Sequence, residues 1–432
     1  MKSAANKGVA KVTAGALSEW SPTAVGLRCK ECAREQGLVA AYVCDFCFGP
    51  LEVVYDYDRI AEMLTRERIA SGPQSLWRYR DLLPCAPTDP ASGLPTGMSP
   101  LIAAPRLAER LGLGEVWIKN EGANPTHSFK DRVVSVALQA ARRLGYQVVA
   151  CASTGNLANS VAAHAAAAGL ESYVFIPHDL EEQKIVATGI YGTNLVAVEG
   201  NYDDVNRLCT ELAADRPWAF VNVNVRPYYA EGSKTLAYEV AEQLGWRIPD
   251  ACVVPIASGS LFTKIYRGFG ELRDAGVISG ELPTMHGAQA DGCGPVAHAW
   301  RENLDFVSPV RPSTIAKSLA IGNPADGLFA LDVARGSNGS VSGVSEKEIV
   351  EGMQLLAETT GIFTETAGGV TTAALVRLAR EGKLTKDASV VVYITGDGLK
   401  TLDVVAPLIE RFTIPPTVAA FEQVVEGAPV AA

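Results

Sequence analysis

The sequence predicts an α/β protein with a mostly parallel, three-layer architecture, and two observations support this prediction. From residue 115 to about residue 412, apolar runs of strand length alternate with stretches of helical periodicity. The chain has 432 residues, 48% of them hydrophobic, and 40 glycines. This composition is sufficient for a large core and for tight turns between strands and helices.

Composition along the chain also divides it into parts. We expect residues 1–56 to form an N-terminal extension that holds a cysteine hairpin at about 25–55. Residues 57–412 would form the main domain, in which 84–100 is a connector rich in proline and glycine. Residues 413–432 would form a short tail.

The most informative segment surrounds Lys130, which is placed at the start of a predicted helix. Ser128 and Asp131 have the spacing of a capping box, so we expect the helix to begin here and to run to Gly145. The positive potential of unpaired amides in a first helical turn favours a neutral, nucleophilic amine. Lys130 is therefore a candidate to form a Schiff base. On this segment alone, an ordinary surface lysine beside a helix cap is an equally good interpretation.

A second predicted strand, turn and helix spans residues 148–169. The apolar strand ends in small polar residues that lie at the start of the helix, where backbone amides can hold a carboxylate or a phosphate. Ser153, Thr154 and Gly155 line this turn, and Asn156 adds a side-chain donor. A well-capped crossover helix explains the turn equally well.

The same pattern recurs at residues 251–261, where a buried strand leads to a helix expected to begin near Phe262. Small residues allow backbone amides to approach an oxyanion closely, which suits a phosphate group. The segment is not a P-loop, because the lysine after a second glycine is missing and Lys264 lies within the helix. The candidate phosphate-binding residues are Ala257, Ser258, Gly259, Ser260 and Leu261.

A fourth segment, residues 389–401, delivers Thr395 from a fully apolar strand to a glycine-rich turn. Its hydroxyl can form a hydrogen bond with a neutral ring nitrogen. In this order, the four segments resemble the fold-type II enzymes that use pyridoxal 5′-phosphate (PLP) and, within them, the threonine synthase family. The resemblance covers about residues 76–405 and is most specific at 128–132, 152–156, 229–235 and 395–400.

The resemblance implies a fold of the tryptophan synthase β type and a role for each segment. The catalytic domain would span 57–412, with a smaller mobile subdomain at roughly 120–230. Lys130 would form the Schiff base with PLP, Asn156 would bond the ring hydroxyl, and Thr395 would meet the pyridine nitrogen. Residues 257–261 would hold the cofactor phosphate.

The implied reaction is that of a carbon–oxygen lyase acting on phosphates. It converts O-phospho-L-homoserine and water to L-threonine and phosphate, the last step of threonine biosynthesis. Ser153 and Thr154 are candidates to hold this substrate, and Arg226 and Lys234 are basic candidates for its phosphate. Arg226 is equally well explained as a solvated loop charge. Glu365 lies on a turn that the family places near the cofactor, or it caps a helix.

Differences from the family pattern, and alternative functions on the same scaffold, leave the identity of the substrate undecided. His127 and Val133 stand where many threonine synthases have glycine, and His127 is either a ligand or a structural residue at the helix entry. A relative on the same scaffold, such as a cysteate synthase or a threonine dehydratase, is the nearer alternative. A regulatory protein that works through its cysteine hairpin is the more distant one.

Four of the nine cysteines form two Cys-x-x-Cys pairs with eleven residues between them. This arrangement is typical of tetrahedral thiolate zinc and resembles a zinc ribbon. A ribbon that has lost its metal is the alternative. The predicted ligands are Cys29, Cys32, Cys44 and Cys47, and we expect the other five cysteines to be buried and inert.

The charge balance bears on partners and location. The formal net charge is −10, so no affinity for nucleic acid or anionic membranes is expected. The N-terminus lacks the apolar core of a signal peptide, and no apolar run reaches membrane-spanning length. We expect a cytoplasmic enzyme, and we expect it to be a homodimer.

Overall fold

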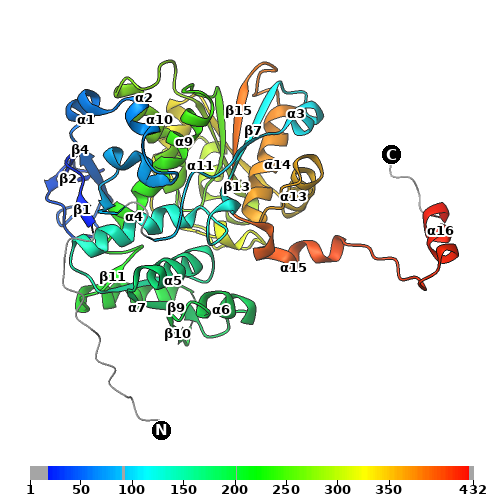
Figure 1. Ribbon diagram of the computed structural model, residues 1–432, viewed down its shortest axis with the longest axis horizontal. Coiled ribbons are helices and arrows are strands. Elements are labelled where there is room, and N and C mark those ends of the chain that lie inside the picture. Colours follow the sequence, from blue (N-terminus) through cyan, green and yellow to red (C-terminus); the bar gives the residue numbers. More distant parts are fainter. Residues whose placement is uncertain (1–17, 90–92, 201, 428–432) are drawn as a thin grey trace, which may run out of the picture.

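The computed structural model describes residues 18–89, 93–200 and 202–427 and has the predicted α/β architecture (Figure 1). Its larger sheet has the strand order β14-β13-β12-β15-β7-β6, and every pair in it is parallel except β6 with β7. These strands are β6 (Leu101–Ala103), β7 (Glu115–Asn120), β12 (Ala251–Pro255), β13 (Thr284–Ala290), β14 (Ser340–Val344) and β15 (Ser389–Ile394).

A second sheet is parallel throughout, in the order β10-β9-β8-β11. Parallel sheets are covered on both faces, which explains why their strands read as continuous apolar runs. The strands are β8 (Val148–Ala152), β9 (Glu171–Pro177), β10 (Asn194–Val198) and β11 (Ala219–Phe220).

Helices cover both faces of the larger sheet. Cys252 and Val254 of β12 join the core that contains α10 (Ser260–Asp274), whereas the alternating Ala251 and Val253 join the core that contains α14 (Thr366–Arg380). Successive side chains of a strand point to opposite faces, so α10 and α14 lie on opposite sides. This arrangement is the predicted three-layer order.

The helices that precede β12 in the chain are α1 (Tyr57–Met63), α2 (Arg66–Ala70), α3 (Pro105–Leu111), α4 (Lys130–Arg143), α5 (Asn156–Ala168), α6 (Glu182–Gly189), α7 (Tyr202–Asp215), α8 (Arg226–Glu231) and α9 (Thr235–Gln243). Those that follow are α10 (Ser260–Asp274), α11 (Pro295–Arg301), α12 (Gly327–Gly336), α13 (Glu346–Thr360), α14 (Thr366–Arg380), α15 (Leu402–Val405) and α16 (Val418–Gly427). Figure 1 shows α16 at the end of an extended segment that leads away from the sheets.

The predicted capping box at the start of α4 is wrong, although the helix begins where it was expected. No side chain caps α4, and Ser128 Oγ has no hydrogen-bond partner within the described part of the chain. The Asp131 carboxylate instead accepts from the amide and hydroxyl of Thr126, at 2.7 and 2.6 Å. It also accepts from Ser160 Oγ at 2.7 Å. The carboxylate therefore ties α4 to α5 and leaves the first turn of α4 uncapped.

The cysteine hairpin is a small antiparallel sheet that packs on the main domain. Its strands are β2 (Ala24–Cys29), β3 (Glu35–Gln36) and β4 (Leu51–Tyr55), in the order β3-β2-β4. Nearby, β1 (Ser18–Trp20) pairs with β5 (Cys85–Pro87). Tyr228 of α8 donates from its hydroxyl to Val39 O of the hairpin at 2.9 Å.

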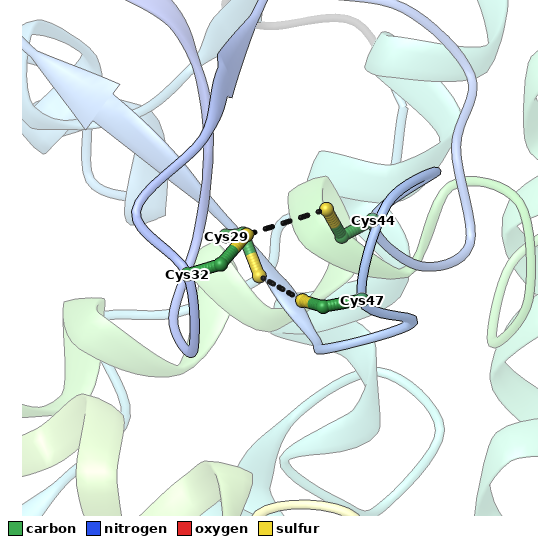
Figure 2. Close-up of side chains that lie close together, drawn as sticks. All are labelled: Cys29, Cys32, Cys44 and Cys47. Carbon is green, nitrogen blue, oxygen red and sulfur yellow. Dashed lines mark hydrogen bonds between the residues drawn. The ribbon is translucent and has the colours of Figure 1, made fainter.

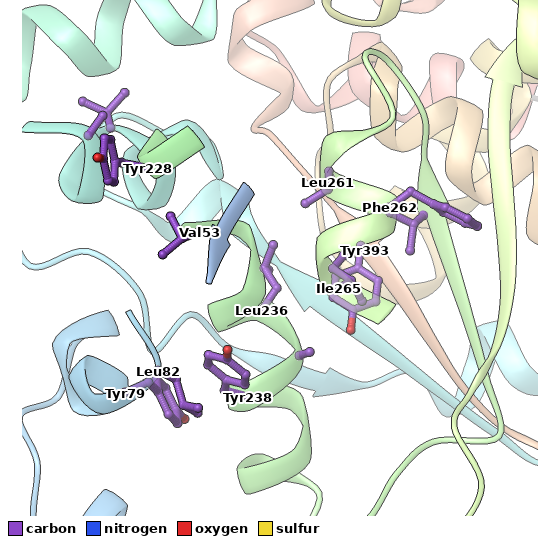
Figure 3. Packing of buried hydrophobic residues seen from close by; sticks show 14 of the residues in the cluster. Val53, Tyr79, Leu82, Tyr228, Leu236, Tyr238, Leu261, Phe262, Ile265 and Tyr393 are labelled. Carbon is purple, nitrogen blue, oxygen red and sulfur yellow. The ribbon is translucent and has the colours of Figure 1, made fainter. Parts of the chain in front are cut away.

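One core cluster joins the hairpin to the larger sheet. It runs from Val53 of β4 through Leu236 and Ile265 to Tyr393 of β15, all of them at most 2% exposed (Figure 3). The hairpin is therefore packed into the catalytic body and is not a loose appendage. Within the residues that the structure describes, no helix combines the length and the apolar character that crossing a membrane requires.

Candidate active site

The Lys130 segment and the Thr395 turn meet at one edge of the larger sheet. β7 and β15 are parallel neighbours, so their carboxyl ends lie together and the segments that follow them come into contact. The amide of Phe129 donates to Thr395 O at 3.0 Å, and Ser128 forms an isolated bridge with Gly396. Lys130 is thereby held next to Thr395, which is 3% exposed.

The Lys130 amine has a tyrosine partner. Lys130 is the first residue of α4, and its Nζ donates to Tyr229 Oη of α8 at 3.1 Å. The same Nζ lies 4.6 Å from the centre of the Phe129 ring. Sequence reasoning singled out residues 229–235 as a motif but did not connect Tyr229 with Lys130, because their segments lie 99 residues apart.

Asn156 and Glu365 form a pair beside the Thr395 turn. Asn156 Nδ2 is 3.0 Å from each carboxylate oxygen of Glu365. Glu365 is 3% exposed, and this burial raises its pKa while the hydrogen bond from Asn156 lowers it. A Cβ on Gly396 would lie 2.5 Å from Glu365 Oε1, so any larger residue there would displace the Glu365 carboxylate. Glu365 occupies the N-cap position of α14, yet its side chain makes no capping hydrogen bond, and the capping interpretation is wrong.

Residues 257–261, here called the phosphate loop, end in the open N-terminus of a long helix. α10 begins at Ser260, two residues before the predicted start, and no side chain caps it. Gly259 has φ +93°, a conformation that glycine adopts without a steric cost. Free amides at a helix N-terminus form a site for an anion. Because β12 lies beside β15, this loop and Thr395 share one edge of the sheet.

Two predicted substrate residues of the second sheet lie at its carboxyl edge. Ser153 follows β8, and its Oγ accepts from the amide of Ala158 at 3.2 Å. This hydroxyl therefore supports the first turn of α5. Thr154 is half-buried in the same turn, one residue before Gly155, which is the N-cap of α5 and carries no side-chain cap.

The two predicted basic residues have different surroundings. Arg226 begins α8 and forms an ion pair with Asp326, with Nη2 2.6 Å from Oδ2. Lys234 is 1% exposed, and its Nζ lies 2.7 Å from Glu231 Oε2 and 3.0 Å from Glu271 Oε2. Two buried carboxylates already bind this ammonium group, which argues against Lys234 as a ligand of a substrate phosphate.

The two histidines near the site differ in burial. His127 is exposed and has φ +62°, a left-handed conformation that residues other than glycine adopt infrequently. Its carbonyl accepts from the amide of Asp397 at 3.0 Å. His164 is 6% exposed, with Nε2 3.2 Å from Asp131 Oδ1, as expected for a packed histidine.

The four hairpin cysteines converge on one point (Figure 2). Their sulfur atoms all lie within 4.8 Å of one another, with 3.4 Å between Cys29 and Cys47 and 3.7 Å between Cys32 and Cys44. Four thiolates bound tetrahedrally to zinc at about 2.3 Å would lie about 3.8 Å apart, so this donor set fits zinc. Two matching knuckles, residues 29–33 and 44–48, supply the sulfurs.

The residues around Lys130 also fit PLP. Ser128 Oγ and Thr366 Oγ1 are buried without a hydrogen-bond partner among the residues that the structure describes. They flank Lys130 and Glu365 in sequence. Together with the uncapped start of α10, they are polar groups that a ring with a phosphate would satisfy.

Comparisons with known proteins agree with this geometry. A family model described as "Pyridoxal-phosphate dependent enzyme" matches residues 94–396. The threonine synthase of Methanocaldococcus jannaschii is 38% identical over 379 residues, which cover 87% of this chain and 93% of that protein. The threonine synthase of Methanosarcina acetivorans is 35% identical over 391 residues, which cover 90% and 95%.

Solved structures show the same fold. Maize serine racemase matches with a TM-score of 0.60 at 18% identity, over 72% of this chain and 91% of that one. The processed threonine deaminase isoform 2 of Solanum lycopersicum matches with a TM-score of 0.58 at 20% identity, over 71% and 87%. The fold, the convergence at Lys130 and the similarity along most of the sequence lead to one assignment: this chain belongs to the PLP-dependent enzymes of fold type II and, within them, to the threonine synthase family.

Proposed function

We propose that the protein is a threonine synthase that converts O-phospho-L-homoserine and water to L-threonine and phosphate. The observation that carries this proposal is that the Lys130 segment contacts the Thr395 turn in a chain of this family. Asn156 is linked to the same turn through Glu365, whose amide donates to Gly396 O. Relatives named threonine synthase are similar to it over about nine tenths of its length.

The cofactor would be held by four groups. Lys130 would form a Schiff base with its aldehyde, and Asn156 would turn its amide from Glu365 to the ring hydroxyl. The phosphate loop would bind the phosphate through its open amides. Thr395 would offer its hydroxyl to the ring nitrogen. When bound, PLP supplies an electron sink for a carbanion at the substrate α carbon.

Lys130 would also act as the base. When it is not bound to the cofactor, its amine would take a proton from the substrate and return one. Tyr229 Oη, 3.1 Å from Nζ, orients that amine. Proton losses at the α and β carbons would allow phosphate to leave the γ carbon. Return of a proton to the γ carbon, addition of water at the β carbon and return of a proton to the α carbon would then give threonine.

Thr395 favours this course over transamination. A hydroxyl does not hold a proton on the ring nitrogen as a carboxylate would, so the electron sink stays mild. For the substrate, the turn of Ser153 and Thr154 would hold the carboxylate at the start of α5, where the N-cap Gly155 provides no side-chain cap. Arg226, which has one carboxylate partner and a side chain 18% exposed, would meet the phosphate. Lys234 is less suited to this role, because it is 1% exposed and two carboxylates bind it.

We further propose that one structural zinc ion binds to Cys29, Cys32, Cys44 and Cys47. The mutual sulfur distances support this proposal. The metal would close the hairpin and take no part in the chemistry.

We also propose that the protein works in the cytoplasm as a homodimer, without a nucleic-acid or membrane partner. The net charge of −10 supports the last point.

The test of the proposed function is a comparison of substrates. The purified protein with PLP should release phosphate and threonine in equal amounts from O-phospho-L-homoserine. Efficient turnover of phosphoserine with sulfite, without turnover of O-phospho-L-homoserine, would replace the assignment with a cysteate synthase. Turnover of threonine alone would replace it with a dehydratase.

A further inference from the structure

The cysteine hairpin is tied to the phosphate loop by one buried carboxylate. Asp326, which precedes α12, is 6% exposed and lies between Lys30 of the first knuckle and Arg226 of α8. Lys30 Nζ is 3.0 Å from Asp326 Oδ1, and Arg226 Nη2 is 2.6 Å from Oδ2. Each oxygen is thus bound by a cation from a distant segment, 296 and 100 residues away.

The backbone of the same aspartate packs directly on the phosphate loop. The Asp326 amide donates to Ser258 O at 2.8 Å. A Cβ on Gly259 would lie 2.4 Å from Asp326 O, so no side chain fits between the two backbones. A shift of Asp326 would therefore move the loop whose amides face the proposed cofactor phosphate.

Lys30 is fixed on the side of the hairpin as well. It directly follows Cys29, and its amide donates to Pro50 O at 2.9 Å. Its side chain is 16% exposed, and the ammonium nitrogen lies 3.4 Å from the centre of the Phe329 ring, close enough for a cation–π contact. Burial lowers the pKa of Lys30, and the nearby Asp326 opposes that shift.

Another cation of the same knuckle region provides a contrast. The Arg34 side chain is 55% exposed, and its partner Asp45 is 67% exposed, with 3.6 Å between their charged atoms. This pair lies in solvent and does not reach the phosphate loop. Arg34 is therefore a matched control for Lys30: it carries the same charge on the same hairpin.

We propose that Lys30 is a positioning residue for cofactor binding, which acts by holding Asp326 and, through it, the phosphate loop. The hairpin thereby stabilises the phosphate loop in the conformation that binds the cofactor phosphate. Zinc bound to the four thiolates would fix the knuckle that carries Lys30. This inference rests on the proposed function of the phosphate loop. Lys30 itself touches neither the substrate nor the reacting atoms.

The first test measures PLP affinity, and it does not depend on turnover. Apo-protein is titrated with PLP, the visible absorbance of the Schiff base is recorded, and zinc per chain is determined for each variant. Lys30→Met should raise the dissociation constant about tenfold, since a charge-assisted hydrogen bond worth about 1.4 kcal/mol is lost. Arg34→Met should leave it unchanged, and Lys30→Arg should restore most of the affinity. Equal dissociation constants for Lys30→Met and Arg34→Met, with zinc retained in both, overturn the proposal.

A second variant separates positioning from a direct effect of charge. Asp326→Asn lies outside both knuckles and should weaken PLP binding while zinc stays bound. In that background, Lys30→Met should change the affinity by about twofold or less, because the two residues act as a unit. A further tenfold loss in the double variant would show that Lys30 acts through space and would overturn the positioning role. Unchanged PLP affinity of the Asp326→Asn variant would also overturn the positioning role.

The same titration distinguishes this inference from the proposed function. Wild-type protein that forms no Schiff base with PLP contradicts the proposed function itself. Wild-type protein that binds PLP, with Lys30→Met binding it equally well, contradicts only the role of Lys30.

Discussion

Replacing Glu239 with glutamine should destabilise the protein strongly, because this carboxylate balances two buried cations. Lys119 Nζ is 2.7 Å from Glu239 Oε2, and Arg132 Nη1 is 2.6 Å from Oε1. All three side chains are 0% exposed. Glutamine has nearly the same shape as glutamate but no charge. After the substitution, Glu121, which pairs with Arg132, would be the carboxylate that remains beside the two cations.

The size of the expected loss in the free energy of unfolding follows from the burial of these charges. Two cations and two carboxylates cancel in the native protein, and the substitution leaves one uncompensated positive charge away from water. Loss of one partner from a buried pair costs about 3–5 kcal/mol in the free energy of unfolding. An exposed pair contributes less than about 1 kcal/mol. Arg247 and Glu115 form such a pair at 2.6 Å, with side chains 48% and 37% exposed.

Urea unfolding followed by tryptophan fluorescence measures the difference. Glu239→Gln and the control Glu115→Gln are compared with the wild type at the same PLP concentration, because bound cofactor adds stability. The distances in the two pairs are nearly equal, so burial is the feature that separates them. If Glu239→Gln costs no more than Glu115→Gln, the reasoning about the buried charges is refuted.

Four further outcomes are expected. Burial raises the pKa of Glu239, but Arg132 and Lys119 outweigh it and hold it at about 2, below the ordinary 4.5. Its stabilisation should therefore be complete above about pH 4.5 and be lost as the pH falls toward 2; unfolding curves at stepped pH check this, and the same pH profile in Glu239→Gln would contradict it. Thr395→Asp should protonate the ring nitrogen and increase keto-acid side products relative to threonine, and an unchanged product ratio would count against the role of the hydroxyl. Cys44→Ser should lower both zinc per chain and the unfolding midpoint while the Schiff-base absorbance persists at saturating PLP, whereas full zinc content would exclude Cys44 as a ligand. Gly259→Ala should weaken PLP binding, because its Cβ meets Asp326 O at 2.4 Å and φ is +93°; wild-type affinity would show that the phosphate lies elsewhere.

The parallel α/β order was predicted from the sequence pattern, whereas the meeting of Lys130 with Thr395 was implied by the resemblance to the family. In the structure, β7 and β15 are parallel neighbours, so the segments that follow them share an edge of the sheet. The pattern of alternating strands and helices is local, so it is readable from one sequence. The start of α4 was also predicted correctly.

What the sequence did not reveal depends on packing between distant segments. The Ser128 and Asp131 spacing fits a capping box, yet Asp131 finds better partners in Thr126 and Ser160. Lys234 was a basic candidate for the substrate phosphate. Its partner Glu231 lies three residues before it, but nothing in the segment shows that Glu271 also binds it.

The contacts that shape the site were hidden for the same reason. Asn156 and Glu365 are 209 residues apart, and Lys30 and Asp326 are 296 residues apart. No spacing rule connects residues at such distances. The two knuckles are the exception, because metal ligands come in short local pairs.

The most direct test of the central claim is the identity of the lysine that binds PLP. Wild-type protein with PLP is reduced with borohydride and digested, and the pyridoxyl group is located by peptide mapping. We predict that it lies on Lys130 and that Lys130→Ala loses the visible absorbance. A pyridoxyl group on Lys400, Lys264 or any other lysine would contradict the account.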